Sequence, residues 1–176
     1  MDYREKRYLK KLVFGDNKTN FTTTQYCKLA KINRNSFYQK YISTAGFFLN
    51  ILERDLLSCT FGTDDADCSM ALENMLKMVY KEWKLYFWIY QKTKHEEHQM
   101  MKAQLIGVMK KIISEYANEM NGISNKNLKK VAEGIYDHLL SLILHNCKKS
   151  FLDAYSSLES YIPEIEGHRC SYFYKK

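Results

Sequence analysis

The sequence predicts an all-α protein, because residues that break helices are rare and apolar residues recur at helical spacing. The 176 residues include only 7 glycines and a single proline, Pro163, and this scarcity favours long helices over turn-rich β structure. Apolar residues make up 45% of the chain and aromatic residues 14%, as expected for a folded protein with a sizeable core. Beyond residue 68, apolar residues repeat every three or four positions, which is the period of one helix face.

The first predicted element is an amphipathic helix over residues 1–14. The turn sequence Gly15-Asp16-Asn17 follows it, and Gly, Asp and Asn are residues that favour turns. The apolar stripe of this helix consists of Tyr8, Leu9, Leu12 and Val13, and its basic stripe of Arg4, Lys6, Arg7, Lys10 and Lys11.

Residues 21–49 carry the most specific pattern in the sequence. They predict two short helices joined by a tight turn, followed by a third helix. The threonines at 22–24 offer an N-cap, since a Thr oxygen accepts a hydrogen bond from an unpaired backbone N–H. Ile32 is expected to plug the turn, and Asn33 to cap a second helix from about Arg34 to Tyr41. Phe37 and Tyr41 then face inward, and the outward residues are Arg34, Asn35, Ser36, Gln39 and Lys40.

The same stretch resembles the N-terminal DNA-binding segment of the TetR family of transcriptional regulators. The matching residues are Thr22, Ala30, Ile32, the Ser36-Phe37-Tyr38 run, Tyr41 and the Phe47-Phe48 pair. The chain departs from the family pattern at Lys31, which replaces a turn glycine, at Asn35, which replaces a common glycine, and at Thr44, which replaces a phosphate-binding lysine. Lys31 therefore has to adopt a positive φ with a side chain present, or the turn has to change shape.

This resemblance implies a transcriptional repressor that binds a palindromic operator as a homodimer and responds to a small-molecule effector. It implies a three-helix helix-turn-helix DNA-binding head with a linking helix over residues 1–58, and a helical-bundle body for effector binding and dimerisation over 59–176. Arg and Gln side chains can read base edges, and hydroxyl and ammonium groups can hold phosphates. The expected DNA-binding residues are Thr22, Thr24, Arg34, Asn35, Ser36, Tyr38, Gln39, Lys40 and Thr44.

The charge distribution agrees with a nucleic-acid-binding head. The formal net charge is +7; residues 1–58 hold eleven Lys and Arg against five Asp and Glu, and the remaining residues hold sixteen against fifteen. A phosphate-binding module attached to a nearly neutral body has this asymmetry. Lysines that only keep a protein soluble would explain the total charge but not its concentration in one third of the chain.

The second part of the chain predicts a bundle of long helices. Helices are expected over 69–91, 96–120 and 125–148, followed by a final helix that starts near Phe151 and ends at Pro163. The inward stripes expected for the first three helices are Leu72, Leu76, Val79, Trp83, Phe87 and Tyr90; Met101, Leu105, Met109, Ile112, Tyr116 and Met120; and Leu128, Val131, Ile135, Leu139 and Leu142. The helix over 125–148 carries two apolar stripes, and two stripes need two partners. We therefore expect a dimer of the last two long helices with their twins, through Leu140, Ile143, Leu144, Cys147, Phe151, Tyr155 and Leu158.

An aromatic segment forms the predicted centre of the body and allows two interpretations. The family resemblance favours an effector pocket, since apolar cavities with a few polar groups are typical of ligand sites. Ordinary core packing is the alternative for any one of these residues. The pocket residues named by the first interpretation are Trp83, Tyr86, Phe87, Tyr90 and Met109.

Other kinds of site have weak or no support in the sequence. His95 and His98 are three residues apart rather than four, so a solvated helix junction is favoured over a metal site. Nucleophile-elbow, phosphate-loop and dinucleotide-binding motifs are missing, so we expect neither an enzyme nor a cofactor. Five scattered cysteines without a CxxC pair argue against disulfides and structural zinc, and a redox role for Cys59 or Cys68 stays open.

The sequence also carries an expectation about location and leaves a rival function. The charged N-terminus lacks an apolar segment, and the longest aromatic-aliphatic run, Leu85 to Tyr90, is too short to span a membrane. A cytoplasmic protein with no membrane partner is therefore expected. The rival is a helical interaction protein whose helix-turn-helix-like head no longer reads a DNA sequence, for which the departures at Lys31 and Thr44 leave room.

Overall fold

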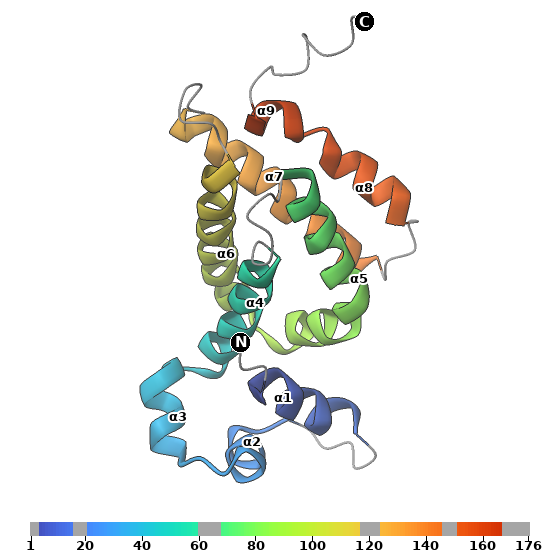
Figure 1. The fold of residues 1–176 in the computed structure, drawn as a ribbon. Helices are drawn as coiled ribbons and strands as arrows, with labels where there is room; N and C mark the ends of the chain where they lie inside the picture. The colour runs from blue at the N-terminus through green and yellow to red at the C-terminus, as the bar shows by residue number, and fades with distance from the viewer. Residues whose placement is uncertain (1–3, 16–20, 60–67, 117–123, 146–150, 167–176) are drawn as a thin grey trace, which may run out of the picture. The chain divides into compact units, whose positions relative to one another are not determined.

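The computed structural model describes residues 4–15, 21–59, 68–116, 124–145 and 151–166. Every regular element among these residues is an α-helix, so the predicted all-α class is confirmed (Figure 1). No helix in the described ranges is both long and apolar enough to cross a membrane. In chain order the helices are α1 (Arg4–Phe14), α2 (Thr23–Ala30), α3 (Arg34–Tyr41), α4 (Thr44–Ser58), α5 (Cys68–Lys92), α6 (His95–Tyr116), α7 (Asn125–Leu144), α8 (Phe151–Glu159) and α9 (Ile162–Glu166).

The chain divides into two compact units, Met1–Leu52 and Glu53–Lys176. The division falls within α4, whereas the predicted domain boundary lies after Ser58, at the end of the same helix.

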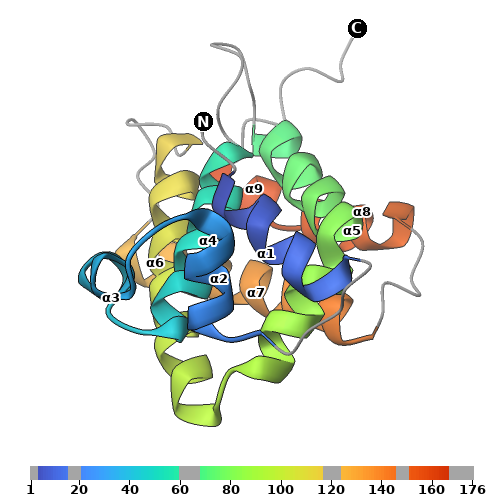
Figure 2. The ribbon, with the colours of Figure 1, turned by 90° about the horizontal axis from the view of Figure 1, so that it is seen from below.

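The first unit is a set of short helices around an aromatic core. Helix α2 packs against both α1 and α3 (Figure 2). Phe37 of α3 is fully buried, and its ring centroid lies 4.9 Å from that of Tyr41, 5.3 Å from Phe47 and 5.7 Å from Tyr26. Such tilted and edge-to-face ring pairs add to the free energy of apolar burial, so Phe37 holds α3 in place.

The second unit is a bundle in which α7 packs against α6 and α5, and α8 packs against α5 (Figure 1). Its buried faces largely follow the predicted apolar stripes. On α6 the buried residues are Met101, Leu105, Ile106, Met109, Ile112 and Ile113, and on α7 they are Leu128, Val131, Ala132, Ile135, Leu139 and Leu142. The predicted stripe residue Met120 lies outside the described residues.

Helix α5 departs from the predicted stripe in its second half. The predicted inward residues Trp83, Phe87 and Tyr90 are only half-buried, and the buried residues are Glu82, Leu85, Tyr86 and Ile89. Both series have helical spacing, so periodicity alone cannot distinguish them. Trp83 and Tyr90 carry a polar atom and can lie half in solvent, whereas Leu85 and Ile89 are compact and fill the core. Phe87 has no polar atom, and it lies on the same helix face as Trp83 and Tyr90.

Pro163 does not end the last long helix, in contrast to the prediction. Helix α8 ends at Glu159, and Pro163 is the second residue of α9. A proline fits the first turn of a helix because the N–H that it lacks would have no partner within the helix there.

Candidate nucleic-acid interface

The turn between α2 and α3 keeps a glycine-like geometry although it contains no glycine. Lys31 adopts φ 54° and ψ 43°, in the left-handed region. The backbone N–H of Lys31 donates to the Lys28 carbonyl at 3.4 Å, and that of Ile32 to the Cys27 carbonyl at 3.0 Å, which is the Schellman pattern of a helix end. Of the two alternatives for Lys31, the chain adopts the positive φ. The prediction that Ile32 plugs the turn is wrong, because Ile32 is 39% exposed while Cys27 and Phe37 on the flanking helices are buried.

Helix α3 presents a polar face to solvent. Its cap, Asn33, accepts a hydrogen bond from the Asn35 backbone N–H at 2.8 Å, as predicted. The buried rings of Phe37 and Tyr41 anchor the opposite side. The exposed side chains of this helix are Arg34, Asn35, Ser36, Tyr38, Gln39 and Lys40.

Three hydroxyl groups from three helices meet beside α3. The Tyr38 hydroxyl donates to Thr23 Oγ1 at 3.4 Å, and Thr23 Oγ1 lies 3.3 Å from Thr44 Oγ1. The pKa of Tyr38 is lowered, because the Thr23 hydroxyl and then the Arg34 guanidinium can donate to its phenolate. Thr23 is buried and was not predicted as a site residue. The run of three threonines indicated the cap but not which member would join this cluster.

The two threonines on either side of Thr23 have different roles. Thr22 is the N-cap, and its Oγ1 accepts a hydrogen bond from the Gln25 backbone N–H at 3.2 Å. It also donates to Gln25 Oε1 at 3.0 Å. Thr24 is exposed in the first helical turn. The amino ends of α2 and α4 therefore carry hydroxyls and backbone N–H groups in the same unit, the chemistry that binds phosphate oxygens.

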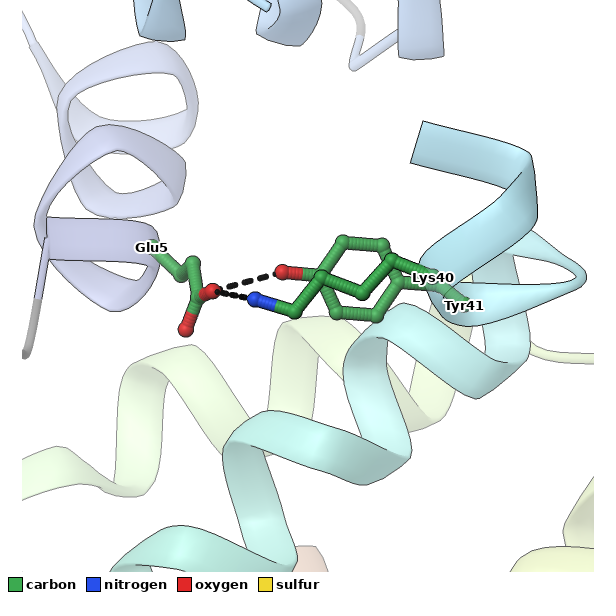
Figure 3. Close-up of polar contacts among 3 residues, drawn as sticks. All are labelled: Glu5, Lys40 and Tyr41. Atoms are coloured by element: carbon green, nitrogen blue, oxygen red, sulfur yellow. Dashed lines mark hydrogen bonds and ion pairs between the residues drawn. The ribbon is translucent and has the colours of Figure 1, made fainter. Parts of the chain in front are cut away.

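Lys40, predicted to hold a phosphate, is engaged within the first unit (Figure 3). Its Nζ lies 2.6 Å from Glu5 Oε1 of α1, and the Tyr41 hydroxyl donates to the same oxygen at 2.6 Å. Lys40 is also 4.9 Å from the centre of the Tyr41 ring. The contact joins residues 35 positions apart, so local sequence patterns could not predict it. The Lys40 side chain remains 58% exposed, and exposed ion pairs contribute little stability.

The junction between α3 and α4 is strained at Ile42. This residue adopts φ 63° and ψ −46°, and the Ser43 backbone N–H donates to the Tyr41 carbonyl at 2.6 Å. This is the rare γ-turn with a positive φ, and such backbone strain costs on the order of 1–3 kcal/mol. Ile42 is 85% exposed, so its own packing does not offset that cost. The sequence contains no glycine or asparagine signal at this position.

The predicted effector residues of the second unit divide between core and partial exposure. Tyr86 and Met109 are buried, and Trp83, Phe87 and Tyr90 are half-buried. This placement is compatible with ordinary core, and the effector pocket stays a prediction. The Tyr86 hydroxyl donates to Asp55 Oδ2 at 2.6 Å, a buried polar contact between α5 and the last turns of α4. Sequence analysis did not identify Asp55.

Replacing Tyr86 by phenylalanine should reveal what this buried contact contributes. The loss of a donor to the buried Asp55 carboxylate is expected to lower the free energy of unfolding by about 1–3 kcal/mol at pH 7. Burial, and next the charge of Asp55, raise the Tyr86 pKa well above 10.0, so the stability that the Tyr86 phenol contributes is present below pH 10 and declines as the pH rises further. Urea unfolding followed by circular dichroism at pH 7 and pH 11 should therefore show a smaller deficit at the higher pH.

The Asp55→Asn variant is the control, since it retains an acceptor for the Tyr86 hydroxyl and should lose less stability. An equal deficit of Tyr86→Phe at both pH values would contradict the raised pKa of the Tyr86 phenol.

The histidines near the start of α6 show no metal-site geometry. His98 Nε2 lies 2.8 Å from the Tyr90 carbonyl oxygen, and the two rings stack at 4.2 Å. Among the described residues, no group of three or more His, Cys, Asp and Glu side chains is arranged to hold a metal ion. His98 therefore joins the end of α5 to the start of α6.

The predicted dimer residues are only partly at the surface of the chain. Leu144 is 37% exposed, whereas Leu158 is fully buried; the expectation that Leu158 faces a second copy is corrected, because α8 uses that side to pack within its own chain. Tyr155 forms a hydrogen bond with Ser69 of α5. Leu140 and Ile143 are half-buried. Cys147 and the Phe151 side chain lie outside the described residues.

All of the formal excess charge belongs to the first unit. Residues 1–52 contain ten Lys and Arg and three Asp and Glu, a balance of +7, and residues 53–176 contain seventeen of each. The unit that presents the polar face of α3 is therefore also the cationic one. Comparisons with protein-family models, curated proteins and solved structures give no match to this chain.

Proposed function

We propose that the chain is a TetR-type transcriptional repressor that reads a palindromic operator through α3. The observation that carries this proposal is the solvent face of α3, which is polar, contains no acidic residue and is anchored from behind by Phe37 and Tyr41. Arg side chains pair bidentately with guanine, and Asn and Gln side chains with adenine, in the major groove. Arg34, Asn35 and Gln39 are the residues assigned to base edges.

Phosphate binding is assigned to the hydroxyl groups around the amino ends of α2 and α4. The buried Thr23 hydroxyl is hydrogen-bonded to both Tyr38 and Thr44, so the positions of the Tyr38 and Thr44 hydroxyls are set before DNA arrives. Ser36 and Thr24 add two exposed hydroxyls. The +7 balance of the first unit supplies the electrostatic attraction on which such contacts depend.

The proposed assembly is a homodimer whose two recognition helices enter successive major grooves, about one helical turn apart. An effector bound among the second unit's helices would act by favouring one separation of the two heads, which requires different affinities for the two arrangements. The partly exposed stripe of Leu140, Ile143 and Leu144 on α7 is the proposed dimer surface. Sedimentation at micromolar concentration tests the dimer, and a species of only 20.9 kDa would exclude it.

Selection from a random duplex library tests DNA reading directly. We expect enrichment of one palindrome, with binding of that palindrome and of random duplex both weakening steeply as salt rises, because each phosphate contact releases counterions. Steep salt dependence without an enriched sequence would mean that the head binds phosphates only. Absence of binding to any duplex at low salt would favour the rival function, a helical interaction protein.

The Glu5–Lys40 pair should limit the contribution of Lys40 to DNA binding. Glu5→Gln removes the carboxylate that holds Lys40 Nζ, so we expect tighter binding to random duplex and a salt slope steeper by about one unit. The measurement is fluorescence anisotropy over a series of salt concentrations.

Lys40→Ala provides the matched comparison for this prediction. It should change the slope little in the wild-type background and by about one unit in the Glu5→Gln background. Equal effects of Lys40→Ala in both backgrounds would show that Glu5 does not restrain Lys40.

A further inference from the structure

The polar face of α3 is bordered by apolar side chains that the fold does not bury. Ile32 before the helix is 39% exposed, Tyr38 within it is 38% exposed, and Ile42 at its end is 85% exposed. Ile42 is the most exposed large apolar side chain among the described residues. Asn35 and Gln39 are four residues apart on one face of α3, and Ile42 follows three residues later, just past the end of the helix.

Neither packing nor backbone geometry explains an isoleucine at position 42. A β-branched residue is poorly suited to a positive φ, and glycine adopts that conformation without the clash of a Cβ atom. The isoleucine therefore carries a conformational cost and gains almost no burial within its own chain. Backbone strain that the rest of the chain does not offset is concentrated at sites that bind ligands.

We propose that Ile42 contacts the C5-methyl group of a thymine in the operator half-site. This inference rests on the proposed DNA-binding function and specifies the class of sequence that is read. The edges of the bases in the major groove are otherwise hydrogen-bond donors and acceptors, so the thymine methyl is the apolar group that an isoleucine can match. The excess positive charge of the first unit makes DNA the occupant that fits this surface.

The order of residues along α3 also specifies the order of bases. Arg34 at the start of the helix suits guanine, Asn35 and Gln39 suit adenine, and Ile42 at the end suits thymine. Eight residues of helix span about 12 Å, which corresponds to roughly three or four base pairs. The thymine read by Ile42 is therefore expected within that distance of the guanine read by Arg34.

The test uses the duplex enriched from the random library, with single thymines replaced by uracil. This replacement removes only the methyl group and leaves base pairing intact. At one thymine of a half-site, uracil should weaken binding of the wild-type protein roughly fourfold, the value of one buried methyl group. Ile42→Ala and Ile42→Gly should bind the thymine and uracil duplexes equally.

Thermal unfolding separates the side chain from the strain. Ile42→Gly should raise the Tm, because glycine accepts the positive φ, and should still lose the thymine preference; Ile42→Ala, which keeps a Cβ atom, should lose the preference with a smaller gain in Tm. Lys31→Gly is the matched control, since Lys31 is the other described non-glycine residue with a positive φ. It should raise the Tm and weaken binding to every duplex, but keep the response to uracil.

Two results would overturn the inference in different ways. If a palindrome is enriched but every uracil substitution affects wild-type and Ile42 variants equally, Ile42 does not read thymine and the proposed function stands. If no palindrome is enriched, the proposed function falls and the thymine contact falls with it.

Discussion

Replacing Arg34 and Gln39 together by alanine is expected to abolish the preference for the operator while leaving the fold intact. Both side chains are exposed on α3, and exposed substitutions usually change stability by about 0.5 kcal/mol or less. Each bidentate base contact discriminates by about 1–3 kcal/mol, so the double variant should lose about 2–6 kcal/mol of discrimination. The measurement is the ratio of affinities for the enriched palindrome and a scrambled duplex.

A control must separate lost base contacts from lost charge. Lys28→Ala removes one positive charge from an exposed position on α2 and should weaken binding to both duplexes by the same factor. If the Arg34→Ala, Gln39→Ala variant retained the wild-type ratio of affinities, the assignment of base-reading residues to α3 would be wrong.

Phe37→Ala is expected to destabilise the first unit more than any other single substitution in α3. The ring is fully buried and is surrounded by those of Tyr26, Tyr41 and Phe47. Truncating a buried phenylalanine costs about 3–5 kcal/mol, a large part of the stability of a unit this small. Hydrogen exchange should show loss of protection of the α3 amides, and DNA binding should be lost with it.

Two variants at and beside this position check the packing argument. Phe37→Leu keeps most of the apolar volume and should cost less than half as much as Phe37→Ala. Tyr38→Ala removes an aromatic ring that is 38% exposed and should leave α3 protected. Protection of α3 in Phe37→Ala comparable to the wild type would show that the aromatic core does not hold this helix.

Local signals were sufficient to predict most helix ends. The caps Thr22 and Asn33 each accept a hydrogen bond from a backbone N–H in the first helical turn, and the predicted range of α3 is the observed one. These interactions join residues two or three positions apart, so they depend on the neighbouring sequence alone. At Lys31 the sequence left two alternatives, a positive φ with a side chain present or a turn of different shape, and the structure adopts the positive φ.

The misassigned face of α5 has a different cause. Residues 83, 87 and 90 and residues 82, 86 and 89 have the same helical spacing, and the choice between them depends on which helices pack against α5. In the structure those helices include α7 and α8. The assignment of Leu158 to the dimer surface has the same cause. Its position in an apolar stripe predicts burial, but the stripe does not distinguish burial within its own chain, which the structure shows, from burial against a second copy.

The all-α class, the helix ends and the cationic character of the first unit follow from composition, capping and periodicity, which act over a few residues. The tertiary structure decided the Glu5–Lys40 pair, the Asp55–Tyr86 contact and the strained turn at Ile42. The first two join residues more than thirty positions apart, and the turn at Ile42 links α3 to α4 in a conformation that isoleucine does not favour. Such contacts depend on how helices pack, because the entropy lost in forming them is offset only when the whole unit folds.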